Sequence, residues 1–197
     1  MRQAAAADLL VRERILDAGA RLFAEHGYDP VSLRQICEAA RVSKGAIYHY
    51  FASKEDLLAQ IVISSLTALL DHVGRELTEA AGAGARLRRF IVSQAAFFEA
   101  QTPHFRVAMA RFAQSGDAAQ QEAIAALRRR YVRAVRTLIT EGIAAGEFRD
   151  VDVAAATRMV LAILYWLARW YKEGGRATAV EIAGQHADLM LAGVWRR

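Results

Sequence analysis

The sequence predicts an all-α protein in two parts, a small N-terminal domain of three helices and a larger C-terminal helical domain. Three observations predict this fold. Ala and Leu, two strong helix formers, are abundant, whereas Pro occurs only twice in 197 residues. Apolar residues recur at helical spacing along most of the chain. Helix start and stop signals separate the periodic stretches. We place the division near residue 52, which gives domains 1–52 and 53–197.

The first helix is expected to run from about Asp8 to His26. Its apolar residues at 15, 16, 19, 22 and 23 form one stripe of helical period. Gly27 then supplies a residue that tolerates the left-handed conformation of a helix end. The second helix should begin at Ser32, because Ser32 and Gln35 have the spacing of a capping box. Cys37, the single cysteine, lies on its apolar face and is expected to be a core residue.

The third helix is expected at residues 44–51, after a tight turn at 41–42. Ser43 is a suitable N-cap, and Ile47 and Phe51 lie four residues apart on one buried face. Lys44, Tyr48 and His49, together with Tyr50, would then point outward. Two short helices joined by a tight turn, with donors exposed on the second, have the layout of a helix-turn-helix. Such a surface suits the major groove of DNA, whereas the alternative is an ordinary amphipathic helix.

Residues 9–60 resemble the DNA-binding domain of the TetR family of bacterial repressors. The resemblance lies in four motifs in the family's order, at 14–28, 32–36, 42–51 and 53–58. It implies a homodimer that binds a palindromic double-stranded DNA operator and responds to a small-molecule effector. One position departs from the family pattern, since members often carry His directly before the Phe of the third helix. Here that residue is Tyr50, and His49 precedes it, so both remain candidates for DNA contact.

The resemblance also implies roles for individual residues in DNA binding. Positions similar to phosphate contacts are Ser32, Ser43, Tyr48 and Lys54. Positions similar to those at or near base edges are Arg34, Lys44, Gly45, Ala46 and His49. The guanidinium of Arg34 has the geometry for a bidentate contact with guanine.

The remaining three quarters of the chain should form six more helices. Their approximate ranges are 53–77, 86–101, 103–115, 118–145, 152–172 and 178–195, and the Ala/Gly-rich segment 80–85 is expected to be a loop. Residues 159–171 are apolar almost all round, so that helix must be covered on two sides. We expect its own core on one side and a second subunit on the other. The last two helices are therefore the predicted dimer interface, and a monomer is the alternative.

A small-molecule site is expected among aromatic and sulfur-bearing side chains of the C-terminal domain. The candidate residues are Phe97, Phe98, Phe105, Met109, Phe112, Tyr131, Trp166 and Trp170. Ordinary core packing is the alternative for each of them.

Basic charge is concentrated between residues 86 and 136, which carry ten arginines and three acids. Arg129 and Arg133 share one helix face, and Arg86, Arg88, Arg89, Arg106 and Arg111 precede them. Guanidinium groups bind phosphates well. An apolar pocket beside them would suit an acyl-CoA thioester, and the segments 141–149 and 166–175 resemble the acyl-CoA-responsive branch of the family. A solvated basic face, with another apolar effector, is the alternative.

Two other classes of function are alternatives. An enzyme is disfavoured because the sequence shows no catalytic His/Asp/Ser arrangement, metal-ligand cluster or Gly-rich phosphate loop, so neither a metal nor a cofactor is expected. A regulator that needs no ligand, or that responds to a protein partner, is the second alternative. The N-terminus lacks the pattern of a signal peptide, and the longest apolar run, 159–168, is too short to span a bilayer. We expect a cytoplasmic protein without a membrane partner.

Overall fold

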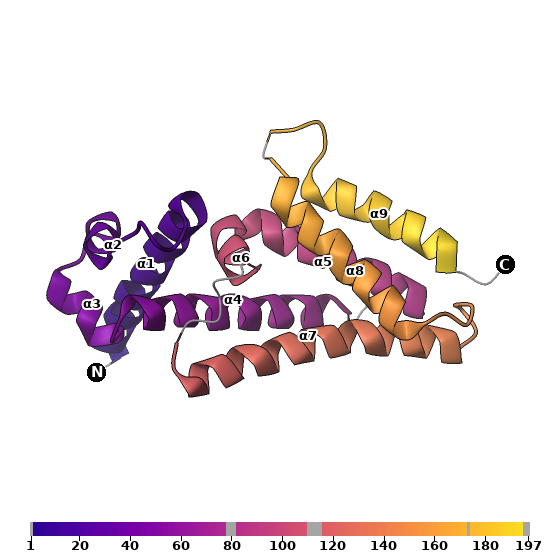
Figure 1. Cartoon of the computed structure of the whole chain (residues 1–197), viewed down its shortest axis with the longest axis horizontal. Helices are drawn as coiled ribbons and strands as arrows, with labels where there is room; N and C mark the ends of the chain where they lie inside the picture. The colour runs from indigo at the N-terminus through magenta and orange to yellow at the C-terminus, as the bar shows by residue number, and fades with distance from the viewer. Residues whose placement is uncertain (1, 78–81, 110–115, 173, 195–197) are drawn as a thin grey trace. The chain divides into compact units, whose positions relative to one another are not determined.

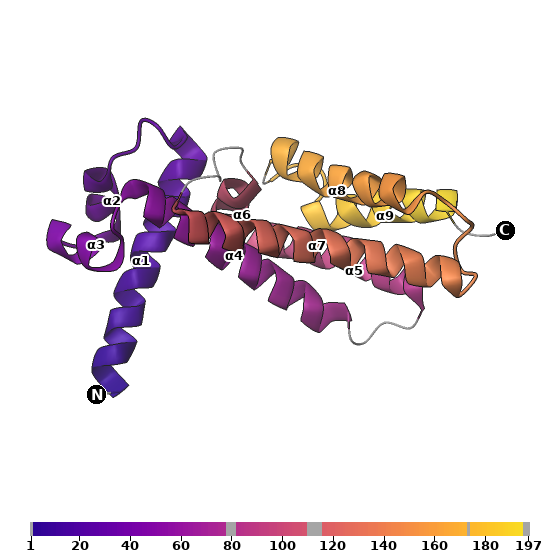
Figure 2. The same cartoon turned by 60° about the horizontal axis from the view of Figure 1, so that its bottom comes forward.

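The computed structural model describes residues 2–77, 82–109, 116–172 and 174–194. Over these residues the chain forms helices and no β-sheet, which confirms the predicted all-α fold (Figures 1 and 2). The helices are α1 (Arg2–His26), α2 (Leu33–Ala40), α3 (Lys44–Tyr50), α4 (Lys54–Glu76), α5 (Ala83–Ala100), α6 (Thr102–Met109), α7 (Ala118–Ala144), α8 (Val153–Trp170) and α9 (Ala179–Val194).

Two helices begin earlier than the sequence predicts. Helix α1 starts at Arg2 rather than near Asp8, and it includes a run of four alanines, the residue with the highest helix propensity. Helix α5 starts at Ala83, so the prediction of a loop up to residue 85 was wrong. The second half of the predicted helix 103–115 lies outside the described residues, as do Arg111 and Phe112.

The early start of α5 has a cause that is distant in the sequence. The carboxylate of Glu147 accepts hydrogen bonds from the backbone N–H groups of Ala83 (2.9 Å) and Gly84 (3.0 Å). These are N–H groups that a helix leaves without an internal partner. Gly146 ends α7 with φ of 71°, and Phe148 then donates its N–H to the carbonyl of Gly142. This reversal of the chain positions Glu147 over the first turn of α5.

The described helices divide into two compact units. The first contains residues 1–66 and 103–125, and the second contains residues 67–102 and 126–197. Helices α4 and α7 therefore contribute residues to both. The predicted domain division between residues 52 and 53 stays a prediction.

The core of the first unit is built from large side chains of four helices. Ile15 and Phe23 of α1 are buried with Ile36 of α2 and Ile47 of α3, and Leu57 and Ile61 of α4 join them. Gly19 allows α1 and α4 to approach closely. A Cβ atom at Gly19 would lie 3.1 Å from a side-chain carbon of Ile61 and 3.3 Å from one of Leu57. The apolar stripe predicted for the first helix thus faces the core.

The second unit is centred on α5, which packs against α9 and also contacts α8. Helix α9 buries Ala179, Ala183 and Ala187 at successive four-residue steps, and these small side chains permit a close approach. Phe90 and Ile91 of α5 are fully buried in this core. Helix α8 directs a second apolar stripe inward, at Val160, Leu164 and Leu167.

Helices α4 and α8 are long and apolar enough to cross a membrane when judged by length and composition alone. Helices in the core of a soluble protein pass the same test. About 56% of the most apolar part of α4 is buried within the protein, but only 33% of that of α8. The large apolar side chains left exposed on α8 are Met159, Tyr165, Trp166 and Trp170. Helix α8 is therefore covered by its own core on one side only.

We predict that Glu147→Gln destabilises the second unit by about 1 kcal/mol, the usual effect of losing a helix N-cap. Hydrogen bonds from the N–H groups of Gly84 and Ala83 lower the pKa of Glu147. A carboxyl group whose pKa is lower when folded contributes stability above its unfolded pKa and loses it as pH falls through the folded pKa.

We therefore expect the free energy of unfolding of Glu147→Gln to lie below that of wild type by this full amount near neutral pH. The difference should shrink below about pH 4, where Glu147 becomes protonated in the wild type. Urea unfolding at several pH values measures it. Glu13→Gln, at an exposed position on α1, is the matched control. Equal stability of the Glu147 variant and wild type at pH 7 would contradict the capping role.

Candidate nucleic-acid interface and ligand pockets

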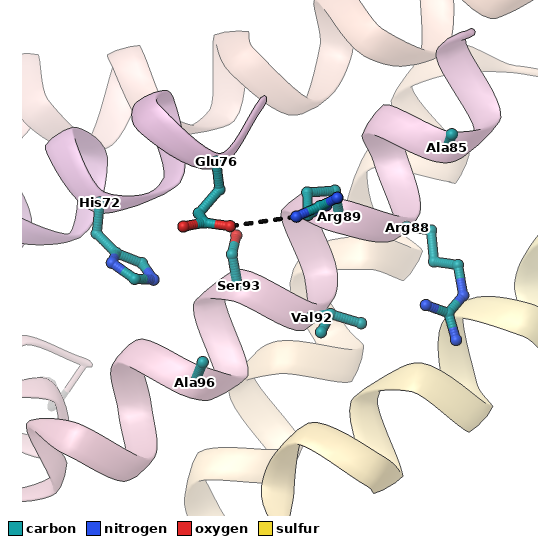
Figure 3. Close-up of a pocket in the computed structure, with 8 residues that line it drawn as sticks. All are labelled: His72, Glu76, Ala85, Arg88, Arg89, Val92, Ser93 and Ala96. Carbon is teal, nitrogen blue, oxygen red and sulfur yellow. Dashed lines mark hydrogen bonds and ion pairs between the residues drawn. The ribbon is translucent and has the colours of Figure 1, made fainter. Parts of the chain in front are cut away.

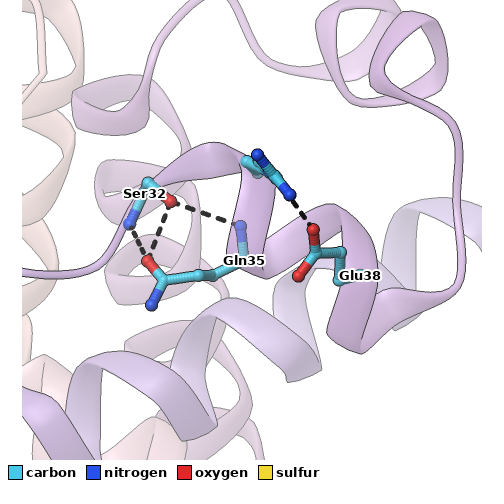
Figure 4. A network of polar contacts seen from close by, with 4 residues as sticks. Ser32, Gln35 and Glu38 are labelled. Carbon is cyan, nitrogen blue, oxygen red and sulfur yellow. Dashed lines mark hydrogen bonds and ion pairs between the residues drawn. The ribbon is translucent and has the colours of Figure 1, made fainter.

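The N-terminus of α2 carries the predicted capping box. The hydroxyl of Ser32 accepts a hydrogen bond from the N–H of Gln35 (3.3 Å), and the Ser32 N–H donates to the Gln35 side-chain oxygen (2.8 Å) (Figure 4). The hydroxyl itself also donates to this oxygen (2.8 Å). Ser32 is exposed, so a phosphate can approach it, but its hydroxyl already serves the cap.

The turn between α2 and α3 closes through Arg41. This residue has φ of 53°, in the left-handed region, and its N–H donates to the carbonyl of Glu38. The carbonyl of Arg41 accepts a hydrogen bond from the guanidinium of Arg14 on α1 (3.1 Å). A non-glycine residue in this conformation is costly, and here these two hydrogen bonds hold it. The tight turn sets the angle at which α3 leaves α2.

Helix α3 presents its predicted outer face to solvent. Ser43 caps it by accepting from the N–H of Ala46 (3.1 Å), and Ile47 and the following Phe51 are buried. Lys44, Gly45 and His49 are exposed, Tyr48 is 50% exposed, and Ala46 is partly covered. The side chains predicted to contact DNA therefore stand on a helix that is fixed to the core from its other side.

Tyr50 differs from its neighbours because it is partly covered and engaged within the protein. Its hydroxyl donates a hydrogen bond to the carboxylate of Asp8 on α1, and this bond raises the pKa of Tyr50. The His49 ring lies edge-on against it, with ring centres 4.8 Å apart. Tyr50 thus ties the end of α3 to α1, a role that the sequence did not indicate. Its contact with DNA stays a prediction.

Lys54 is also engaged within the protein. Its ammonium donates to the carbonyls of Val31 (2.9 Å), Tyr28 (3.0 Å) and Asp29 (3.3 Å), and lies 4.1 Å from the centre of the Tyr28 ring. An ammonium has three N–H donors, so these carbonyls account for all of them. A contact between Lys54 and phosphate stays a prediction, and it would compete with this attachment of the loop before α2.

The structure brings three of the predicted DNA-contacting residues to one groove between α2 and α3. Arg34, Lys44 and Tyr48 line this groove, which has a volume of about 390 Å³. The Arg34 side chain is 88% exposed, and its Nε donates to Glu38 one turn later (2.9 Å). The ion pair holds the guanidinium on the exposed face of α2 and offsets its charge in the absence of DNA.

Asp56 connects the end of α3 to the start of α7 within the first unit. One carboxylate oxygen accepts from the N–H of Ala52 (2.8 Å), and the other accepts from the side-chain amide of Gln120 (2.6 Å). Nearby, His104 of α6 lies 3.1 Å from the carboxylate of Asp17 on α1. Burial lowers the pKa of His104, although Asp17 acts in the opposite direction. Asp56 and Gln120 are far apart in the sequence, as are Asp17 and His104, so periodicity could not reveal these two contacts.

The described residues that are predicted to bind a ligand belong to two units, and their meeting in one pocket stays a prediction. Phe97 contacts the His72 ring, Phe98 contacts Tyr171, and the Tyr131 hydroxyl donates to Gln94, all in the second unit. Burial raises the pKa of Tyr131. Phe105 and Met109 belong to the first unit, and Phe112 lies outside the described residues.

Four of the other predicted ligand residues are on exposed surfaces. Trp166 and Trp170 of α8 are 59% and 51% exposed. Arg129 and Arg133 of α7 are exposed as well. Their part in ligand binding stays a prediction.

A pocket that the sequence did not indicate lies between the end of α4 and the start of α5. It has a volume of about 550 Å³ and is lined by His72, Glu76, Ala85, Arg88, Arg89, Val92, Ser93 and Ala96. Figure 3 shows Glu76 of α4 and Arg89 of α5 facing each other across it. The residues lie at helical spacing on one face of α4 and one face of α5, and the sequence does not show that these two faces meet. Only the two arginines were in the basic cluster noted in the sequence.

We predict different effects for the two lysines near α3. Lys54→Gln should lower the melting temperature by about 2–4 °C, because three carbonyls lose their donor. Lys44→Gln should leave the melting temperature unchanged, but it should weaken DNA binding and relax the preference for operator over random duplexes, as expected of a residue at a base edge. Calorimetry and DNA titrations at several salt concentrations measure both effects. A stable Lys54→Gln protein with a reduced salt slope would show that this ammonium serves DNA and not the loop.

Comparisons with known proteins agree with this geometry. The family model "Bacterial regulatory proteins, tetR family" matches residues 15–61, and "Tetracyclin repressor-like, C-terminal domain" matches residues 80–194. The HTH-type transcriptional repressor KstR2 of Rhodococcus jostii is 27% identical over 194 residues, which cover 93% of this chain and 90% of that protein.

Two solved structures share the fold of this chain. The TetR family transcriptional regulator PfmR from Thermus thermophilus aligns with a TM-score of 0.84 and 37% identity, over 93% of this chain and 100% of that one. AibR in complex with isovaleryl coenzyme A and operator DNA aligns with a TM-score of 0.81 and 24% identity, over 94% and 98% of the two chains. The likeness to AibR is one of fold. The chain belongs to the TetR family of bacterial regulatory proteins, as a transcriptional regulator with an N-terminal helix-turn-helix.

Proposed function

We propose that this protein is a homodimeric, cytoplasmic repressor that binds a palindromic operator and releases it when a small molecule binds the C-terminal domain. One observation carries the DNA-binding part. Helix α3 is capped by Ser43 and anchored by the buried Ile47, and it exposes Lys44, Gly45 and His49 on its outer face. This is a rigid platform of donors with a nearly bare backbone at its start, which is what the floor of the major groove admits.

The contacts divide by chemistry. Hydroxyl groups of Ser32, Ser43 and Tyr48, with the ammonium of Lys54, are assigned to phosphates, which position the protein without reading sequence. Arg34, Lys44 and His49 are assigned to base edges. The small residues Gly45 and Ala46 allow the backbone of α3 to approach the bases closely. A two-fold dimer would place its two α3 helices roughly 34–36 Å apart, in successive major grooves.

The dimer would form through α8 and α9. Helix α8 leaves Met159, Trp166 and Trp170 at least half exposed on one face, and Leu189 of α9 is 74% exposed. A patch of large apolar side chains on a monomer marks an interaction surface. Pairing α8 and α9 with the same helices of a second subunit would cover this patch by a four-helix bundle. The same face explains why the sequence of α8 is apolar almost all round.

The effector is proposed to be an acyl-CoA thioester, with another apolar small molecule as the alternative. AibR has the same fold, and its solved complex contains isovaleryl coenzyme A together with operator DNA. The basic, aromatic-rich C-terminal domain of this chain suits a ligand with phosphates and an apolar tail. Such a ligand releases DNA only if it binds the non-binding conformation more tightly, since equal affinity for both conformations shifts nothing.

The DNA-reading roles are tested by two substitutions. Tyr48→Ala should weaken binding to operator and random duplexes by similar factors, because a phosphate contact carries no sequence information. Arg34→Ala should weaken operator binding by about 1–3 kcal/mol and relax the preference for operator over random DNA. Fluorescence anisotropy with both duplexes at fixed salt measures these ratios. Equal losses on both duplexes for Arg34→Ala would refute its base-reading role.

The dimer interface is tested by Trp166→Glu, which places a charge in the exposed face of α8. We expect sedimentation to shift from dimer to monomer, because a buried unpaired carboxylate is strongly unfavourable. Operator affinity should fall together with dimer content. Arg149→Glu, at an exposed position after α7, is the control that should remain dimeric. A fully dimeric Trp166→Glu protein would place the interface elsewhere.

A further inference from the structure

We propose that the pocket between α4 and α5 holds the phosphate groups of the effector, with Arg89 and Arg88 as their ligands. The inference rests on the proposed function, since it takes the effector to be a phosphate-bearing thioester. It assigns the anion subsite to the start of α5 and not to Arg129 and Arg133 of α7, which the sequence pattern favoured.

The two arginines are held in place by acids on neighbouring helices. Arg88 donates to both carboxylate oxygens of Asp188 on α9, through Nε (2.7 Å) and Nη2 (3.2 Å). Arg89 donates through Nη1 to Glu76 on α4 at the longer distance of 3.4 Å. Their side chains are 48% and 43% exposed, so solvent and ligands reach both. A guanidinium has five N–H donors, and each of these contacts uses only part of that set.

The rest of the pocket has the mixed character of a ligand site. Ala85, Val92 and Ala96 give it apolar surface, while His72 and Ser93 lie on the side of Glu76 (Figure 3). The hydroxyl of Ser93 donates to the carbonyl of Phe90. The Nε2 atom of His72 is buried and has no hydrogen-bond partner among the described residues. A buried polar atom without a partner is unfavourable, and a bound polar group would satisfy it.

The pocket continues toward an aromatic residue. A second pocket of about 480 Å³ shares His72 and Ala96 with the first, and the His72 and Phe97 rings in it lie 5.7 Å apart. Its other lining residues are Ala68 and Ala100, with the polar residues Asp71, Arg75 and Gln101. The two pockets adjoin at His72 and Ala96, so an elongated molecule can extend from the arginine pair toward Phe97 along α4 and α5.

Substitutions of Glu76 and Arg89 distinguish phosphate binding from a purely structural role of their ion pair. If the pocket binds phosphate, the two substitutions change ligand affinity in opposite directions. In the unliganded protein the carboxylate of Glu76 holds Arg89, and it would repel a phosphate in the same pocket. A bound phosphate therefore competes with Glu76 for the charge of Arg89. Removing the negative charge by Glu76→Gln should favour phosphate binding, whereas removing the positive charge by Arg89→Gln should oppose it.

The experiment is calorimetric titration of wild-type and variant proteins with octanoyl-CoA, CoA and octanoate, with the operator bound and free. We expect Arg89→Gln to bind octanoyl-CoA at least about tenfold more weakly, with octanoate unaffected. Glu76→Gln should bind octanoyl-CoA about two- to fivefold more tightly. Arg149→Gln is the matched control for loss of an exposed arginine, and thermal unfolding verifies that each variant is folded.

Several outcomes overturn the assignment, and they separate it from the proposed function. If wild type binds octanoyl-CoA and the loss occurs in Arg129→Gln/Arg133→Gln but not in Arg89→Gln, the subsite lies on α7 and the acyl-CoA proposal survives. Weaker binding by Glu76→Gln overturns the competition argued for Arg89. If wild type binds the operator but neither octanoyl-CoA nor CoA, both the pocket assignment and the effector proposal fail, while the DNA-binding proposal stands.

Discussion

Helix α3 has only seven residues, and a helix of that length does not persist in water by itself. It exists here because Ile47 and Phe51 are buried in the core of the first unit, and because Ser43 satisfies the N–H of Ala46. Every exposed side chain on α3 depends on this anchoring. The turn at Arg41 and the bond between Tyr50 and Asp8 then hold the two ends of the helix against its neighbours.

The first unit includes more than the three N-terminal helices, because α6 and the start of α7 belong to it. Asp56 joins the N–H of Ala52, directly after α3, to the amide of Gln120. His104 joins α6 to Asp17 of α1. A displacement of α6 or of the start of α7 would strain these hydrogen bonds. These contacts connect α6 and the start of α7 to the N-terminal helices within this unit.

Charge along the sequence does not specify charge in space. The arginines of α7 form a dense cluster in the sequence, and Arg129 and Arg133 are exposed on that helix. Arg88 and Arg89 attract less notice in the sequence, but acids of α9 and α4 fix them at a pocket. The packing of the helices decides which basic side chains line the same pocket. A count of charges along the sequence carries no information about that packing.

The sequence by itself determined what depends on neighbours within a few residues. The capping box at Ser32, the stop at Gly27 and the cap of α3 appear where the spacing predicts them, since each is a contact across three or four residues. The apolar stripes likewise identified the core faces of α1 and α2, and the motifs identified the family.

Only the tertiary structure decided what depends on distant partners. Glu147, 64 residues from Ala83 in the sequence, accepts the hydrogen bond that lets α5 begin there. The ammonium of Lys54 donates hydrogen bonds to carbonyls of the loop before α2. The physical reason is the same in each case. Hydrogen bonds and pockets require groups to meet in space, and helical periodicity specifies which face is buried but not which side chain it meets.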